Sequence, residues 1–254
     1  MDKRQQDIVE SYSEILKNKD VDLAMSVGRH SDHLGLAEDI WADVSSKLNL
    51  KTGCSLLDIG CGFGEVTEFC LKTAKQLDMQ LHLVDIPEAV KKIQSEMRSI
   101  VPKNTFFWGG VFPEVTNAPK FPKKFDLILV YSVLHCTDYP EEFVEKTVSL
   151  LVEGGQLLLG DLPNVHRKGR FLSSDQGRRF EAEYRQVAIE KIPEYKNQFD
   201  FFERCDNQNK KINDDFISNT VSTYRSKGYH VYVLPQPEGL PFCKTREDVL
   251  IVSP

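Results

Sequence analysis

The sequence of 254 residues lacks several features that mark special classes of protein. It has no excess of positive charge, because its formal net charge is −6, and this argues against nucleic acid or another large polyanion as a partner. No apolar run is long enough to cross a bilayer, and residues 1–17 have no apolar centre like that of a signal peptide. We therefore expect a cytoplasmic protein that neither inserts into a membrane nor binds nucleic acid.

Paired cysteines are also missing. The six cysteines are scattered, and no two have the CxxC spacing of a zinc site or of a thiol redox pair. We expect reduced, mostly buried thiols and no metal. The chain also has no internal repeat, low-complexity tract or linker, so a single domain is predicted.

What is present is a regular alternation of short apolar runs with helical patterns. The runs predict strands over residues 54–60, 80–86, 104–110, 124–135 and 156–162. The helical patterns cover residues 36–48, 65–77, 87–100 and 140–155, with a weaker one over 5–25. Apolar strands that alternate with helices are typical of a parallel sheet covered on both faces, which makes the fold class α/β.

The alternation stops after Asp161. Residues 163–227 are rich in charged and aromatic side chains and are predicted to hold two or three helices. Two further strands are predicted over residues 229–236 and 247–253. The link between them is short, so we expect them to pair antiparallel as a hairpin.

The stretch LLDIGCGFG, residues 56–64, indicates a ligand site. Glycines at a strand-to-helix turn let a ligand approach the backbone, and the helix that follows presents unpaired N–H groups. A Walker loop is excluded because no lysine is in place, and the spacing is GxGxG rather than the GxGxxG of dinucleotide-binding turns. Asp58, two residues before the first glycine, would repel a diphosphate and attract an ammonium group.

A second acid narrows the choice of ligand. Asp85 ends the next predicted strand, 27 residues after Asp58, where a carboxylate can accept hydrogen bonds from two ribose hydroxyls. A cationic group near the glycines, a ribose near Asp85 and no diphosphate together fit S-adenosylmethionine. A purely structural turn and a different nucleotide ligand are the alternatives.

LLDIGCGFG together with LVDI, residues 83–86, resembles the class I S-adenosylmethionine-dependent methyltransferases, over about residues 50–165 and the final hairpin. The resemblance implies a Rossmann-like, seven-stranded, mostly parallel sheet with an antiparallel last strand and helices on both faces. It also implies one domain over residues 1–254. Its expected parts are an N-terminal helical cap (1–50), a cofactor-binding core (51–162), a helical insertion or lid after the fifth strand (163–227) and a C-terminal β-hairpin (228–254).

The resemblance implies roles for single residues around S-adenosyl-L-methionine and its product S-adenosyl-L-homocysteine. The loop WGGVFPEV, residues 108–115, offers no Asp to the adenine amino group, so backbone groups are expected to bind it. The expected contacts are Asp58, Gly60, Cys61 and Gly62 at the amino-acid end, Asp85 at the ribose, Ile86, Gly110 and Val111 at the adenine, and Tyr131 and Ser132 at the methyl group.

Ligands of open α/β sheets bind at the carboxyl ends of the strands, and these ends also hold His135 and Asp161. His135 follows the fourth predicted strand, and imidazole titrates near neutral pH. Three roles remain as alternatives for His135: a catalytic base, a group that orients the substrate, or a structural brace for the loop.

The segment GRHSDH, residues 28–33, is a second candidate for catalysis. Arg29 is expected to meet an anionic substrate, and His30 is expected to serve as a base, whereas the alternative is a helix cap on the surface. The spacing of the histidines and Asp32 is too irregular to predict a metal site.

A third candidate lies just past the fifth strand, at the edge of the expected cleft. Guanidinium groups match planar oxyanions with two parallel hydrogen bonds, so this region is expected to bind an anionic small molecule unless it is only a solvated loop. The residues expected to do so are His166, Arg167, Arg170 and Arg178.

The segments GDLPNVHRKGRFLSS, GYHVYVLPQP and REDVLIV resemble bacterial methyltransferases associated with surface-polysaccharide (capsule or lipopolysaccharide) biosynthesis. The resemblance implies methylation of an oxygen on a sugar, a sugar nucleotide or a phosphate-like capsule precursor. The alternatives are methylation of a quinone or an amine, and a non-catalytic module that only binds the cofactor. The aromatic segment 192–205 suits either a lid or the surface of a homodimer.

Overall fold

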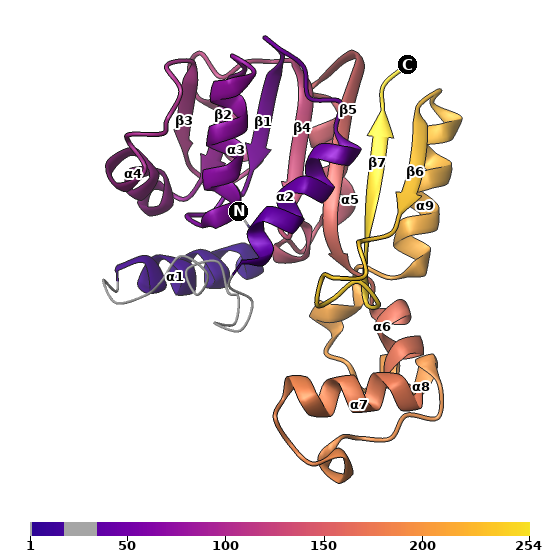
Figure 1. Ribbon diagram of the computed structural model, residues 1–254. Coiled ribbons are helices and arrows are strands. Elements are labelled where there is room, and N and C mark those ends of the chain that lie inside the picture. The colour runs from indigo at the N-terminus through magenta and orange to yellow at the C-terminus, as the bar shows by residue number, and fades with distance from the viewer. Residues whose placement is uncertain (1, 18–34) are drawn as a thin grey trace.

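The computed structural model describes residues 2–17 and 35–254, which are built around one seven-stranded sheet (Figure 1). In chain order the strands are β1 (Ser55–Ile59), β2 (Gln80–Asp85), β3 (Thr105–Gly109), β4 (Phe125–Tyr131), β5 (Leu151–Pro163), β6 (His230–Leu234) and β7 (Arg246–Val252). Their order in the sheet is β3-β2-β1-β4-β5-β7-β6. β7 is antiparallel to both neighbours and the other pairs are parallel, which confirms the predicted Rossmann-like sheet with a reversed last strand.

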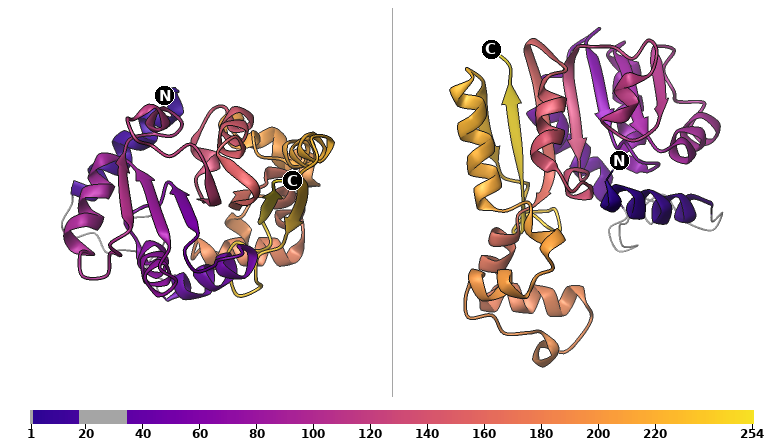
Figure 2. Two further views of the ribbon diagram at one scale, coloured as in Figure 1. Left: turned by 90° about the horizontal axis from the view of Figure 1, so that it is seen from above. Right: turned by 180° about the vertical axis from the view of Figure 1, so that it is seen from behind.

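Helices cover both faces of the sheet, as the views in Figure 2 show. The α-helices are α1 (Lys3–Lys17), α2 (Leu36–Lys47), α3 (Glu65–Gln76), α4 (Pro87–Glu96), α5 (Pro140–Val148), α6 (Val165–Leu172), α7 (Asp175–Tyr184), α8 (Gln198–Arg204) and α9 (Asp214–Ser226). Successive strand residues face opposite sides. Leu56 therefore packs in the core under α2, α3 and α4, whereas Leu57 packs in the core under α5 and α9. Both leucines are buried, so β1 is apolar throughout as predicted.

The first helix, α1, lies across the end of the sheet at which the parallel strands finish (Figure 1). Its Gln5 side chain donates from Nε2 to the carbonyl of Phe112 over 3.2 Å. Further along the helix, the Tyr12 hydroxyl accepts a hydrogen bond from the backbone N–H of Phe63 over 3.0 Å. These contacts hold α1 over the loops that leave β1 and β3.

Two predicted boundaries are wrong. β4 ends at Tyr131 instead of continuing to residue 135, because Ser132 has a positive φ of 58° and turns the chain into the 3₁₀ turn η4 (Leu134–Cys136). β5 begins at Leu151 instead of residue 156, because Leu151 pairs with Phe125 and α5 has already ended. An apolar run such as residues 150–152 suits a helix or a strand equally, and the neighbouring strand decides.

The insertion after β5 holds four α-helices, α6 to α9, where two or three were predicted. α9 returns to cover the sheet, whereas α6, α7 and α8 project beyond the end of the sheet on the side where β5 finishes (Figure 1). These projecting helices have a small core of their own, formed by Val165, Leu172 and Phe201. The predicted hairpin of the last two strands is confirmed.

Candidate active site

The turn between β1 and α3 contains glycines at positions where any other residue would be strained. Gly60 and Gly62 have positive φ angles of 72° and 66°. A Cβ at Gly60 would also lie only 2.4 Å from Cγ2 of Val133. Thr67 fixes the turn from α3, because its hydroxyl donates to the carbonyls of Cys61 (2.6 Å) and Gly62 (3.1 Å). The turn is therefore tight, bare of side chains and rigid.

Two buried carboxyl groups flank this turn. Asp85 accepts from the N–H of Gly62 and from the N–H of Ile86, each over 2.7 Å. Asp58 accepts no hydrogen bond from any of the described residues. Burial, followed by the nearby charge of Asp85, raises the pKa of Asp58 to about 7. Burial raises the pKa of Asp85 to about 6, although its two backbone hydrogen bonds act to lower it.

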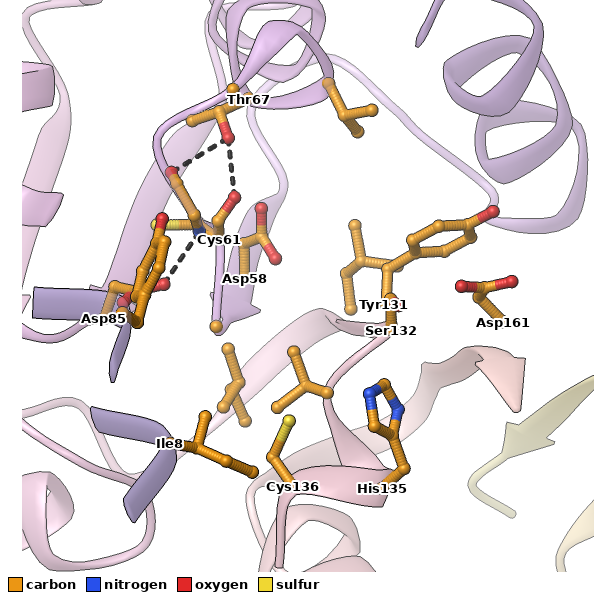
Figure 3. A pocket seen from close by; sticks show the side chains of 18 of the residues that line it. Ile8, Asp58, Cys61, Thr67, Asp85, Tyr131, Ser132, His135, Cys136 and Asp161 are labelled. Carbon is orange, nitrogen blue, oxygen red and sulfur yellow. Dashed lines mark hydrogen bonds between the residues drawn. The ribbon is translucent and has the colours of Figure 1, made fainter. Parts of the chain in front are cut away.

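Both carboxyl groups open into one cavity of about 760 Å³, shown in Figure 3. The cavity lies at the carboxyl ends of β1, β2, β4 and β5, where open α/β sheets bind their ligands. Its volume is within the range of 300–1,000 Å³ typical of small-molecule sites. Eleven residues proposed from the sequence line it together: Asp58, Gly60, Cys61, Gly62, Asp85, Ile86, Gly110, Val111, Tyr131, Ser132 and His135.

His135 points into the cavity from η4, opposite the glycine turn (Figure 3). Its Nδ1 is buried and has no hydrogen-bond partner among the described residues. Burial, and then the positive charges of Arg246 and Arg4, lower the pKa of His135 to about 4, against the opposing effect of Asp161. The imidazole is therefore neutral at pH 7, with a nitrogen left for a ligand.

Several lining residues have no counterpart in the sequence predictions. From α1, Tyr12 reaches the glycine turn. At the start of β7, Arg246 forms an ion pair with Asp161, and Gln236 donates to the same carboxylate over 3.1 Å. Asp161 is itself held through its N–H by Asp248, over 2.8 Å. Tyr12, Gln236 and Arg246 lie far from the glycine turn along the chain, so no local motif marks them.

Four of the five residues proposed to bind an anionic substrate, His166, Arg167, Arg170 and Arg178, are not among those that line the cavity. Three of them are paired with carboxylates nearby. Arg167 contacts Glu247 at 3.3 Å, and Arg170 contacts Asp214 at 2.5 Å. Arg178 contacts Glu194 at 2.9 Å.

The fourth, His166, lies 3.7 Å from Asp214 and packs against two phenylalanines of α8. The structure therefore gives these four side chains partners on β7, on α8 and α9 and in the segment before α8, and their binding of substrate stays a prediction. Arg29 and His30 lie outside the described residues.

The described part of the chain brings no three His, Cys, Asp or Glu side chains together in a way that suits a metal ion. Within the same residues, no helix combines the length and the apolarity needed to cross a bilayer.

Comparison with known proteins finds methyltransferases that are similar to this chain. Residues 57–157 match a family model described as a methyltransferase domain. The malonyl-[acyl-carrier protein] O-methyltransferase of Halalkalibacterium halodurans is 32% identical over 104 residues, which are 41% of this chain and only 37% of that protein. The stretch that the family model matches contains the glycine turn, Asp85 and His135.

Solved structures extend the likeness to nearly the whole chain. Phosphoethanolamine N-methyltransferase 1 of Haemonchus contortus, in complex with phosphoethanolamine and S-adenosylhomocysteine, has a TM-score of 0.62 at 14% identity, over 98% of this chain and 48% of that one. The plantazolicin methyltransferase BpumL, in complex with a monoazolic substrate analog and SAH, has a TM-score of 0.56 at 14% identity, over 98% of both chains. Residues 57–157 are thus similar to a methyltransferase domain, and the chain has the Rossmann-like fold of these solved methyltransferases.

Proposed function

We propose that this protein binds S-adenosylmethionine and transfers the methyl group to a small molecule. The observation that carries the proposal is the pair of buried carboxyl groups, Asp58 and Asp85, on either side of a bare glycine turn. Asp58 has no donor among the described residues, and its raised pKa reflects a buried charge without compensation. An ammonium or sulfonium group beside it would supply that compensation, whereas a diphosphate would add to the repulsion.

The residues around the cavity suit the rest of this cofactor. Asp85 uses one oxygen for each of its two backbone N–H donors, and a carboxylate oxygen accepts more than one hydrogen bond, so ribose hydroxyls have acceptors there. Ile86 and the backbone of Gly110 and Val111 would contact the adenine. When bound, the cofactor supplies a methyl group on a positively charged sulfur.

The chain's own part in the reaction is alignment and exclusion of water. Holding two reactants in line can lower a barrier by about 7–11 kcal/mol in the best cases. α1 lines part of the cavity, and Tyr184 and Phe242 line it from α7 and the β6–β7 connection. His135 is neutral at pH 7 and is a weak base, so it suits a hydrogen bond that orients the acceptor better than removal of a proton.

For the acceptor, we propose an oxygen of a small anionic molecule such as a sugar, a sugar nucleotide or a phosphate-like capsule precursor. An acceptor oxygen that is already ionised requires no strong base, in agreement with the low pKa of His135. The named relatives act on malonyl-[acyl-carrier protein], phosphoethanolamine and plantazolicin, which differ too much to choose among acceptors. Ile15, Leu240 and Phe242 also line the cavity, and they favour as a second candidate an acceptor with an apolar part, such as a quinone.

Isothermal titration calorimetry tests the cofactor. We expect S-adenosylmethionine and S-adenosylhomocysteine to bind and NAD to give no heat. Binding of NAD together with no binding of S-adenosylhomocysteine would refute the proposal. A panel of phosphorylated sugars, nucleotide-linked sugars and quinones, assayed with a methyl-labelled donor, then tests the acceptor. All six cysteines are free thiols, in keeping with a proposed site of action in the cytoplasm, and gel filtration tests the proposed homodimer.

A further inference from the structure

Arg4 is a half-buried cation on α1, a helix that lines part of the cavity. Its Nε and Nη1 atoms are buried and form no hydrogen bond or ion pair with the described residues. A buried guanidinium without acceptors is costly, because a charged group loses its hydration and gains nothing in return. The other arginines discussed above, on α6 and α7, all have carboxylate partners. Arg4 therefore keeps two donors that no described residue uses and that suit an anion.

The position of Arg4 relates this anion to the proposed active site. Seven residues of α1 line the cavity, and Arg4 is not one of them, but it lies next to Gln5 and one turn before Ile8, which both do. Its charge acts on His135 and on Cys136, both of which line the cavity. Arg4 is therefore beside η4, at the end of the cavity where the His135 side chain projects.

Arg246 is a second cation whose charge acts on His135, and unlike Arg4 it lines the cavity. Arg246 donates to Asp161 and to Ser132 through Nη1 alone, so Nη2 and Nε have no acceptor among the described residues. The guanidinium lies over the ring of Phe242, 4.9 Å from its centroid, which fixes its plane. The charges of both guanidinium groups thus act on His135, and its Nδ1 has no partner among the described residues either.

We infer that the acceptor carries a carboxylate or phosphate oxyanion and that Arg4 and Arg246 bind this group beside His135. The inference rests on the proposed methyl transfer, and it moves the anion site from the projecting helices α6 and α7 into the cavity itself. Guanidinium groups bind such oxyanions through paired hydrogen bonds, and two of them would fix the orientation of the acceptor.

The experiment measures binding of benzoate and of inorganic phosphate, as probes of the two oxyanions, by NMR of the His135 ring in the protein with and without S-adenosylhomocysteine. We expect Arg4→Gln to weaken binding of at least one probe by 10-fold or more, and Arg4→Lys to weaken it less. Arg98→Gln, on the exposed surface of the segment after α4, is the matched control and should bind as the wild type does. In Arg4→Gln the pKa of His135 should also rise toward its ordinary value, because one positive charge is removed.

Two results would overturn the inference. One is binding of both probes at wild-type strength in Arg4→Gln. The other is a 10-fold loss of affinity for S-adenosylhomocysteine in Arg4→Gln with no loss for 5′-methylthioadenosine, which lacks the amino-acid carboxylate, because Arg4 would then bind the cofactor. The proposed function fails separately, if the wild-type protein binds the probes but not S-adenosylhomocysteine.

Discussion

Replacing Asp58 by Asn should stabilise the protein and at the same time impair its binding of the cofactor. Burial, and then the charge of Asp85, raise the pKa of Asp58 from 3.8 to about 7. At 1.36 kcal/mol per pKa unit this corresponds to about 2–4 kcal/mol against the ionised form, once the part shared with Asp85 is discounted. Asn keeps the shape of the side chain and removes the charge, so the ligand-free variant should be more stable than the wild type by this amount at pH 8.

The sign of the pH dependence follows from the raised pKa. Between about pH 4 and pH 7 the folded protein binds the Asp58 proton and the unfolded chain does not, so this group's contribution to stability is lost as the pH rises through that range. The advantage of Asp58→Asn should therefore be large at pH 8 and small near pH 5. For a chain of this size it corresponds to a rise in Tm of roughly 4–16 °C. Glu96→Gln, an exposed carboxylate on α4, serves as the control.

Binding of the cofactor should change in the opposite direction. Loss of a hydrogen bond to a charged group costs about 1.5–3 kcal/mol, so the affinity of Asp58→Asn for S-adenosylmethionine should fall roughly 10–150-fold at pH 8. Thermal unfolding at pH 5 and pH 8, with calorimetric titration of the ligand, measures both effects. A variant that is less stable than the wild type at pH 8, or one that binds the cofactor with unchanged affinity, would refute the reasoning.

Three further predictions concern other parts of the site. In Gly60→Ala a Cβ would lie 2.4 Å from a Val133 methyl group, on a residue of positive φ, so the free energy of unfolding in urea should fall by about 2–4 kcal/mol. Gly53→Ala also has a positive φ but open space around its Cβ, and it should cost about 1 kcal/mol. Equal losses in the two variants would disprove the contact. Lys47→Met removes the partner of the fully buried Asp248 and should cost about 3–5 kcal/mol in the same assay, and a loss below about 1 kcal/mol would contradict this. His135→Asn should raise the KM for the acceptor and lower kcat less than about 10²-fold, without altering the pH–rate profile near pH 6.5; a larger loss together with a changed profile would make it the base.

The parts of the site that the sequence predicts are those encoded by neighbouring residues. The glycine turn and Asp58 lie within seven residues, and Asp85 ends the next strand, so strand topology alone brings them together. His135 was found for the same reason, since it follows β4 after one short turn. All of these line the cavity.

Contacts between distant segments were not predictable in this way. Tyr12 and its partner Phe63 are 51 residues apart in the sequence, and Arg246 and Asp161 are 85 residues apart. Arg170 is a residue type expected at an anion site, but its guanidinium already donates to the carboxylate of Asp214, 44 residues later. A single sequence records which charges are present, whereas pairing depends on how the insertion folds back.

β7 lies between β5 and β6, although it is the last of the seven strands along the chain. During synthesis, β1 to β5 can associate as soon as they emerge, but β6 has no edge to join until β7 has inserted beside it. The same strand carries Arg246, which lines the cavity, and Asp248, which accepts from the N–H of Asp161. On a growing chain the glycine turn, Asp58 and Asp85 would therefore be in place before Arg246 completes the cavity.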